Sequence, residues 1–530
     1  MSDGPTSGDR PRLDRLPGPA ADLAATTLAW SDRWYDPERH LLWNPPGSFT
    51  PDLDDLSWHL VPTSAWYAVG LLLRDDPGDA DRAAAVLDAV VATQYDEPGT
   101  AWHGTYARFL EWPHPPPDAT VWVHYDPNWR QFVGTALALV LTHFADDLPA
   151  DLTARLDASL LLAVRGEPPD RVDPGYTNIA LMRSWLDAVA GRRHDDPALV
   201  ARGEALAAAV VERFDEHGAF AEHNSPTYYG IDLYALALWA RRPPTPPFAA
   251  WGERLEAALW RDLASRYHAG LRELAGPWSR AYGMSLADHV GAFAVWVWAA
   301  LGRDVAPLPD LDGPFEHGHD LPIGPVAALL GAAIPADAAA HLRHFPGERI
   351  VAADLPGAAH RRSTTWLADD IAVGAESCDA GWSAHGQYHP ATAHWRVPGR
   401  GTAWLRVVHP GPLDAEVVPG RLVVRARPHR HRGAVATRLV VGLPAGLDTP
   451  PTETRAHPAG PAADSPGADP QRVRWTLPGC ALDITVRGGT IGPASPGPGR
   501  ATHLEITPTG STGEVVVAVT FAPAADGAPV

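Results

Sequence analysis

A proline- and glycine-rich stretch, APLPDLDGPFEHGHDLPIGP, occupies positions 306–325 and separates two kinds of hydrophobic pattern. Upstream, from about residue 20 to 301, apolar residues recur at helical spacing in a series of segments: 81–94, 134–144, 152–165, 177–190, 197–214, 231–241, 251–267 and 285–301. After residue 350 the period changes to two, which is typical of short strands between Gly and Pro turns: 349–355, 370–376, 403–408, 421–427, 437–441, 473–477, 482–486 and 515–521. Many helix pairs in one chain fit a superhelix or a closed toroid, and the strands fit an antiparallel sandwich or stacked sheets.

These patterns predict an α+β multidomain protein. A short Ala-rich helix is expected at 327–342, and a low-complexity loop rich in Pro, Ala and Asp at 449–470. We expect a disordered N-terminus at 1–19, a helical catalytic domain at 20–305, a linker at 306–325 and an antiparallel β domain at 326–530.

The charge of the chain limits its partners. Its 530 residues contain 43 Lys plus Arg and 63 Asp plus Glu, a net charge of −20. Such a protein repels nucleic-acid backbones and anionic membrane surfaces, so neither is expected as a main partner. An acidic sugar would be repelled in the same way, so it would need a local pocket lined by arginine.

All 43 basic residues are arginine, and the chain contains no lysine. This excludes P-loop enzymes, protein kinases and pyridoxal enzymes, because each requires a lysine for its chemistry.

Cysteine content and hydropathy indicate the compartment. The two cysteines, Cys378 and Cys480, are too few for a disulfide framework or a Cys-rich zinc site. The first residues have neither a basic start nor an apolar core of a secretory signal, and no run of about 18 apolar residues occurs. We therefore expect a soluble, cytoplasmic protein.

The densest polar and aromatic cluster is HGAFAEHNSPTYYG at 217–230, between two expected helices. Taken alone, it fits a helix-capping loop with packed tyrosine rings better than an active site. Asn178 opens an earlier helix and Arg280 precedes a later one, and each alone is equally compatible with a cap or a surface ion pair. Because loops at the same end of alternating helices converge, Asn178, the segment 223–229 and Arg280 are expected to line one cleft.

At this cluster the chain resembles the toroid-plus-sandwich polysaccharide lyases, meaning chondroitin AC/hyaluronate lyases and heparinase II/III-like enzymes. Those families use an Asn, then a His and a Tyr in one segment, then an Arg. Their segment, roughly Gly-x-Phe-x-Asp-His followed by Tyr-x-Gly, stands here as GAFAEH at 218–223 and YYG at 228–230. The resemblance matches Asn178, His223 and Arg280 to the family residues. It implies an incomplete (α/α) toroid followed by an antiparallel β-sandwich.

The catalytic tyrosine is where this sequence departs from the family pattern. In the families it lies just after the Gly, where Ile231 and Asp232 stand here. Tyr228, Tyr229 and Tyr234 compete for the role, and we favour Tyr228.

The resemblance implies β-elimination from a uronate-containing oligosaccharide or polysaccharide. Removal of the proton next to the carboxylate builds negative charge there, which Asn178, His223 and Arg280 would stabilise. A tyrosine would act as base and acid if a nearby Arg or His lowers its pKa. The scheme requires no metal and no cofactor. Substrate-binding residues are expected to be Tyr229, Tyr282, Trp129, Arg130, Trp102, His103 and Asn224.

Two rival functions remain open at this stage. A glycoside hydrolase on a similar toroid would need two facing carboxylates. A non-catalytic carbohydrate-binding protein would bind sugar through tryptophan side chains and would not convert it. The acidic candidates for hydrolysis are Asp126, Asp173, Glu222 and Asp232.

Histidines elsewhere carry weaker signals. His385, His389 and His394 could bind zinc, but no carboxylate or Cys accompanies them, so we expect a strand or loop there. His317 and His319 lie in the expected linker.

Overall fold

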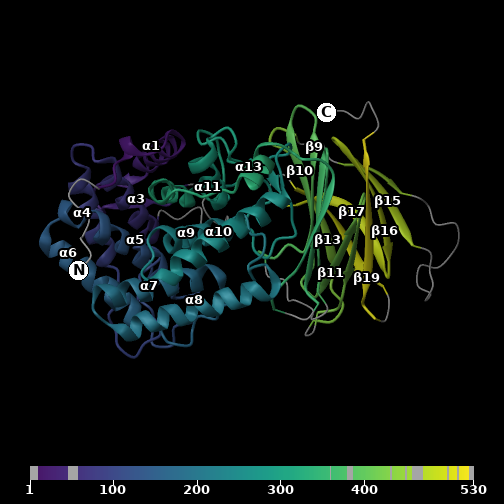
Figure 1. Cartoon of the computed structure of the whole chain (residues 1–530). Coiled ribbons are helices and arrows are strands. Elements are labelled where there is room, and N and C mark those ends of the chain that lie inside the picture. Colours follow the sequence, from purple (N-terminus) through teal and green to yellow (C-terminus); the bar gives the residue numbers. More distant parts are fainter. Residues whose placement is uncertain are drawn as a thin grey trace. The chain divides into compact units, whose positions relative to one another are not determined.

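The computed structural model describes residues 10–45, 58–357, 360–378, 386–429, 432–447, 451–455, 470–497, 501–509 and 512–524. They form two compact units. The helical unit comprises Met1–Arg213, Thr227–Leu259 and Ala287–Ile334, and the β unit comprises Phe214–Pro226, Trp260–Leu286 and Pro335–Val530. Figure 1 shows the helices in purple to teal and the large sheets in green to yellow.

Helices dominate the first 301 residues. They are α1 (Gly18–Asp32), α3 (Val61–Arg74), α4 (Asp79–Val91), α5 (Trp129–His143), α6 (Ala150–Arg165), α7 (Thr177–Arg193), α8 (Pro197–His217), α9 (Tyr228–Arg241), α10 (Pro246–Arg266) and α11 (Ala292–Leu301). Short elements accompany them: the strands β1 (Tyr35–Asp36), β2 (Leu41–Trp43), β3 (His59–Leu60), β4 (Tyr267–His268) and β5 (Glu273–Leu274), and the 3-10 helices η1 (Leu13–Arg15) and η2 (Ala145–Asp147). Later come η3 (Gly318–Ile323), α12 (Gly324–Leu330) and α13 (Ala336–Arg343).

Six helices of the helical unit form a closed inner ring. In order of contact these are α1, α3, α5, α7, α9 and α11, and α11 packs back against α1. The inner helices α3 and α11 are apolar on nearly all sides, which is the pattern of a helix that is buried all round. Outer helix α4 instead buries only one face. The (α/α) toroid is therefore confirmed, and its ring closes where an incomplete one was expected.

Gly230 allows α9 and α11 to approach closely. A Cβ atom at this position would lie 2.3 Å from the carbonyl carbon of Ala292 and 2.4 Å from the amide nitrogen of Phe293. No side chain fits that gap, so the glycine of the YYG sequence has a packing role.

Residues 10–19 and 306–325 differ from their expected states. Residues 10–19 include η1 and the start of α1, and Arg10 pairs with Asp75 and Asp147 at 3.0 and 2.7 Å. These ion pairs give an order that a polar, Pro-rich composition does not indicate. Residues 306–325 belong to the helical unit, where η3 packs on α1, α3 and α11.

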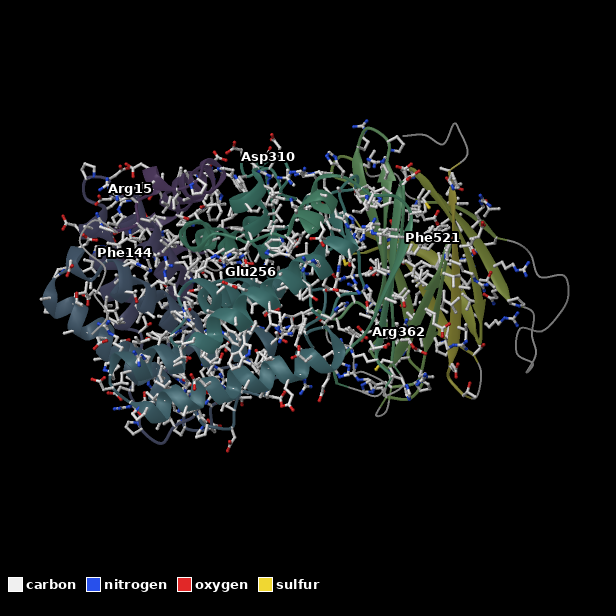
Figure 2. The ribbon with its side chains drawn as sticks, viewed as in Figure 1. Arg15, Phe144, Glu256, Asp310, Arg362 and Phe521 are labelled. Atoms are coloured by element: carbon white, nitrogen blue, oxygen red, sulfur yellow. The ribbon has the colours of Figure 1, made fainter. Side chains whose placement is uncertain are left out.

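A buried ion pair joins the later helices of this unit. The carboxylate of Glu256, labelled in Figure 2, is nearly fully buried. It accepts hydrogen bonds from Arg241 Nη1 and Nη2 at 2.9 and 3.0 Å and from the Ala333 amide at 3.0 Å. Glu256 thus ties α9 and α10 to the chain that follows α12.

The β unit contains two large antiparallel sheets besides the short pair β4-β5. The eight-stranded sheet has the order β17-β18-β13-β10-β9-β8-β7-β6, and the six-stranded sheet has the order β11-β12-β19-β16-β15-β14. The strands are β6 (Arg349–Asp354), β7 (Arg362–Ala368), β8 (Ile371–Ser377), β9 (Ala391–Val397), β10 (Gly401–Val408), β11 (Leu413–Val418), β12 (Arg421–Ala426), β13 (Thr437–Gly442), β14 (Thr452–Arg455), β15 (Gln471–Leu477), β16 (Cys480–Arg487), β17 (Gly489–Pro496), β18 (Ala501–Pro508) and β19 (Val515–Pro523). Most of the expected loop at 449–470 lies outside the described residues.

One apolar core lies between the two sheets. Trp395 and Leu405 from the larger sheet pack with Val424, Trp475 and Ile484 from the smaller one. In β10 buried and more exposed residues alternate, as expected for a sheet with one face on a core. The predicted α+β class with an antiparallel β domain is confirmed.

Strand β8 is buried on both faces because the segment 275–277 crosses its outer face. A Cβ atom on Gly374 would lie 1.9 Å from the carbonyl carbon of Gly276. Thr365 Oγ1 donates to the carbonyl oxygen of Gly276 at 2.7 Å. This contact explains why Trp260–Leu286 groups with the sheets although its sequence continues the helical region.

Among the described residues, no helix combines the length and apolar character needed to cross a bilayer.

Candidate functional site

The predicted site residues fall into both units. Asn178 and Tyr228 belong to the helical unit, and His223 and Arg280 belong to the β unit.

In the helical unit, Asn178 lies in the first turn of α7 and is buried. The residues that precede α7 are held by side chains from α5 and its N-terminus. Asn128 Nδ2 donates to the Tyr176 hydroxyl at 2.8 Å, and Arg171 Nη1 donates to Asn128 Oδ1 at 3.0 Å. The position of Asn178 is therefore fixed by a polar network just before its helix.

That network continues to a buried carboxylate. Arg171 Nη2 and Gln131 Nε2 donate to Glu167 Oε2 at 2.8 and 2.7 Å. Burial raises the pKa of Glu167, but the charge and hydrogen bonds of Arg171 outweigh it, and the net pKa lies below its ordinary value. Glu167 therefore stays ionised. Sequence analysis missed this group, because Glu167 and Arg171 stand in a loop with no motif.

The three competing tyrosines differ in burial. Tyr228 is the first residue of α9 and is partly exposed, whereas Tyr229 and Tyr234 are buried. Burial raises the pKa of Tyr234, and its ring packs 6.3 Å from that of Trp66. A fully buried phenol with a raised pKa is a poor base, so of the three Tyr228 is best placed for proton transfer.

The proposed sugar-binding residues near 102–130 have mixed surroundings. All the hydrogen bonds seen for the buried Arg130 go to backbone carbonyls: to His103 at 3.1 Å, Ala101 at 3.0 Å and Pro127 at 3.3 Å. Trp102 is buried, and its Nε1 donates to Glu97 at 3.1 Å. Arg130 and Trp102 thus hold the 97–103 loop.

Other rings in this region lie nearer the surface. Trp129 is partly exposed, and its ring centroid lies 5.2 Å from that of Phe132. His103 Nδ1 lies 3.6 Å from Asp96 Oδ1. The ring of Trp122 is exposed as well, at 62%.

In the β unit, the segment 223–225 is bonded to the segment 275–280. Asn224, at φ 53°, donates through Nδ2 to the carbonyl oxygens of Ala275 and Pro277 at 2.7 and 2.9 Å. The Ser279 amide donates to the His223 carbonyl at 3.1 Å. The amide of Asn224, expected to bind substrate, therefore holds these two loops together.

Arg280 is the best oriented cation of this group. Its Nη1 donates to Glu222 Oε1 at 2.8 Å and its Nε donates to Gln387 Oε1 at 3.1 Å. Its side chain is 22% exposed, against 9% for Glu222. Tyr282, two residues on, is exposed. Arg280 is thus held in one orientation while part of it reaches solvent.

His223 is fully buried. Its Nε2 lies 3.1 Å from Ser363 Oγ, and its Nδ1 lies 3.8 Å from Asp262 Oδ2. Burial, with the positive charges of Arg266 and Arg361, lowers the pKa of His223 to about 3. The imidazole is therefore neutral at pH 7.

A buried network supports the loop that carries Glu222 and His223. Arg361 Nε donates to Glu376 Oε1 at 2.6 Å, and the Tyr388 hydroxyl donates to the same oxygen at 3.0 Å. Arg361 Nη1 also donates to the Ala221 carbonyl at 3.2 Å. The only sequence signal for this network was a charge, Glu376, within an apolar strand.

The histidine-rich segment after β8 holds the loop that carries Arg280. His389 Nε2 lies 3.3 Å from the Ala281 carbonyl, and His394 Nε2 lies 2.7 Å from that of Met284. His385 lies outside the described residues. A cavity of about 410 Å³ opens beside His389, with Tyr388, Arg406 and Arg438 among its lining residues.

Three solved structures with fold similarity differ in activity. A xanthan lyase of Paenibacillus is 14% identical at a TM-score of 0.41, and the match covers 97% of this chain and 58% of that one. A heparan sulfate lyase from Pedobacter heparinus is 11% identical at a TM-score of 0.34, covering 100% of this chain and 86% of that one. An endoglucanase from Clostridium thermocellum is 12% identical at a TM-score of 0.30, covering 96% and 93%.

The chain therefore spans just over half the length of the xanthan lyase. A comparison with curated proteins gave no match. Residues 21–332 match the family described as Domain of unknown function (DUF8769), and the chain belongs to this family.

Proposed function

We propose that this protein is a carbon–oxygen lyase that cleaves uronate-containing oligosaccharides by β-elimination. Tyr228 removes the proton next to the uronate carboxylate and returns a proton to the leaving oxygen. Arg280, with Asn178 and His223, stabilises the charge that builds up on the carboxylate. The observation that carries the proposal is the Arg280 guanidinium, which Glu222 and Gln387 orient while part of it reaches solvent.

The hydrogen-bond and ion-pair partners of the acidic residues favour elimination over hydrolysis. A hydrolase needs one carboxylic acid that donates a proton and a second carboxylate that faces it. Glu222 is ion-paired with Arg280 at 2.8 Å. Asp126 and Asp173 each accept a backbone N–H two residues further on, at 2.8 and 2.7 Å, as turn-forming aspartates do. These three candidates thus have structural partners.

A fixed local cation supports the proposal of an acidic substrate. A protein of net charge −20 repels anions in general, so an acidic sugar needs a fixed local cation, which Arg280 supplies. The exposed Trp122 is suited to stacking on a sugar ring.

The test is incubation of the purified protein with a panel of uronate oligosaccharides. Elimination yields a conjugated unsaturated uronate with ultraviolet absorbance, whereas hydrolysis yields new reducing ends without that absorbance. The critical variant is Glu222→Gln, which keeps an acceptor for Arg280 and removes the carboxylic acid. We expect it to retain turnover. A dead Glu222→Gln together with an active Tyr228→Phe would replace the lyase proposal by hydrolysis.

A further inference from the structure

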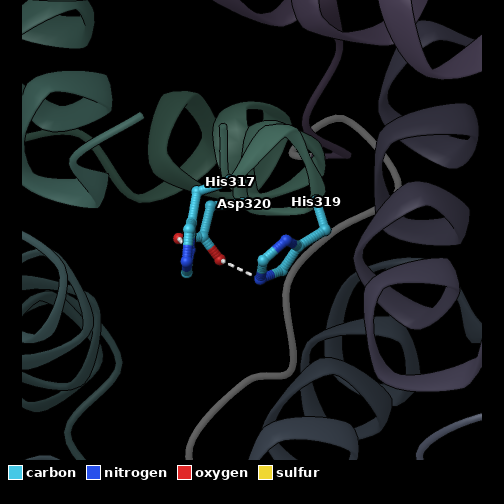
Figure 3. Close-up of side chains that lie close together, drawn as sticks. All are labelled: His317, His319 and Asp320. Carbon is cyan, nitrogen blue, oxygen red and sulfur yellow. Dashed lines mark ion pairs between the residues drawn. The ribbon is translucent and has the colours of Figure 1, made fainter. Parts of the chain in front are cut away.

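Two histidines and an aspartate converge at the start of η3 in the helical unit. Figure 3 shows the side chains of His317, His319 and Asp320 projecting from this segment in the same direction, with the Asp320 carboxylate between the two rings. Each offers one ligand atom, and these atoms all lie within 4.8 Å of one another. His317 Nδ1 is 3.7 Å from Asp320 Oδ2, and His319 Nε2 is 3.6 Å from Asp320 Oδ1.

These separations are too long for hydrogen bonds but suit ligands around a common ion. Two ligands of a tetrahedral zinc ion, each bound at about 2.0–2.1 Å, lie roughly 3.4 Å apart. A rearrangement of a few tenths of an ångström would bring each His–Asp pair to that spacing. A simple His–Asp hydrogen bond would require a closer approach, below about 3.2 Å.

A second observation comes from His289, on another part of the chain. Its side chain is 2% exposed and its ring centroid lies 4.9 Å from that of His317. Its Nε2 is buried and has no hydrogen-bond partner, and the same holds for Asp320 Oδ2. Buried polar atoms are rarely left without partners, and an ion is one of the standard explanations.

The backbone fixes this arrangement. The Val290 amide donates to the Glu316 carbonyl at 3.0 Å, and the Glu316 amide donates to the Asp288 carbonyl at 2.8 Å. These two bonds place His289 beside His317. His317 itself adopts a left-handed φ of 61°, a conformation that His takes more often than most non-Gly residues.

We propose that His317, His319 and Asp320 bind one divalent transition-metal ion of the zinc type, with His289 as its fourth ligand. Three imidazoles and one carboxylate are the ligand types that zinc takes in proteins, and four protein ligands in a buried position are typical of a structural site. Because η3 packs on α1, α3 and α11, the ion clamps the region where the helical ring closes. The sequence predicts no metal site because its possible ligands are not all closely spaced along the chain. His289, which lies 28 residues before His317, could not be recognised as a ligand in this way.

The experiment uses the full chain freed of metal with a chelator, and neither readout depends on catalysis. Zinc is titrated by calorimetry, and Co²⁺ is added separately to record its visible spectrum. We expect one ion per chain, a higher Tm with zinc, and the intense visible bands of tetrahedral Co²⁺. Asp320→Asn and His319→Gln, which keep side-chain volume, should each weaken zinc binding at least 10-fold, the lower range for loss of even an outer-shell partner.

The matched control is His114→Gln, a histidine of the same unit whose side chain is 61% exposed. It should bind zinc like the wild type. The proposal is overturned if the wild type takes up no stoichiometric zinc, or if His114→Gln weakens binding as much as His319→Gln. Should either ligand variant fail to fold, the Co²⁺ spectrum of the wild type alone decides, because a spectrum of hydrated Co²⁺ refutes the site.

Discussion

Replacing Glu376 by Ala is expected to lower the free energy of unfolding of the β unit by about 3–5 kcal/mol. Glu376 and Arg361 are both essentially inaccessible to solvent, with side chains 1% and 0% exposed. Removal of the carboxylate leaves the Arg361 charge buried without its anion, and this uncompensated charge is the main cost. The Tyr388 hydroxyl loses its acceptor as well.

The double variant Arg361→Met with Glu376→Leu provides the control. Replacing a whole buried ion pair by apolar residues of similar size is often nearly neutral, because both desolvation penalties disappear together. We therefore expect the double variant to be more stable than Glu376→Ala by about 2 kcal/mol or more. It still lacks the hydrogen bond from Arg361 to the Ala221 carbonyl, so the loop that carries Glu222 should loosen.

The assay is urea unfolding followed by tryptophan fluorescence, with amide hydrogen exchange across residues 219–226. A change in the urea midpoint at constant slope reports the free energy lost. If Glu376→Ala loses less than about 1 kcal/mol, the pair is not isolated from water as the structure has it. If exchange in 219–226 does not rise in the double variant, the network does not hold this loop.

Three further predictions concern the active-site region. Tyr228→Phe should lower turnover by about 100-fold or more because it removes the hydroxyl proposed to transfer the proton, and the buried control Tyr234→Phe should not; steady-state kinetics compares them. Gly230→Ala should destabilise the helical unit by about 1–3 kcal/mol, because the new Cβ meets the Ala292 backbone at 2.3 Å. We expect this steric cost to outweigh the gain of about 1 kcal/mol in helix propensity. A urea midpoint at or above that of the wild type would contradict the prediction. His223 stays neutral in the folded protein, where its pKa is lowered to about 3, but it protonates near pH 6.5 in the unfolded chain. Its contribution to the free energy of unfolding is therefore complete above about pH 6.5. On acidification towards pH 3 this contribution falls by up to about 1.4 kcal/mol per pH unit. His223→Gln should flatten the fall in unfolding free energy between pH 7 and 5, and an unchanged slope would refute the burial argument.

Hydrophobic periodicity predicted many elements of both units, but the expected strands did not include β7, β9, β11, β14, β17 or β18. The expected helix at 177–190 corresponds to α7, and the expected strand at 437–441 corresponds to β13. Inner helices α3 and α11 are buried on nearly every side, and strands on the sandwich core alternate, so each leaves a local pattern in the sequence.

Membership of the units could not be predicted in this way. The segment 260–286 groups with the sheets because Gly276 and Gly374 let two backbones pass within contact distance. Nothing local to either glycine indicates the other, since they lie 98 positions apart in the sequence.

The roles of polar residues were equally hidden. Asn224 and Arg130 were expected to bind substrate because they are polar residues in aromatic-rich loops, yet the bonds seen for Asn224 Nδ2 and for Arg130 go to backbone carbonyls. The residue type shows that a side chain can donate hydrogen bonds, but only the tertiary structure shows which groups accept them.

Within the proposed elimination, His223 and Arg280 cannot have equivalent roles. A histidine whose pKa is lowered to about 3 carries no charge at pH 7, so it can only donate or accept a hydrogen bond. Asn178 and Tyr228 are also uncharged in their ordinary states. Arg280 is therefore the one residue of the four that brings a positive charge to the developing carboxylate dianion. The hydrogen bond that Arg280 donates to Glu222 is then an orienting contact, and the proposed chemistry needs an arginine whose fork is fixed before substrate arrives.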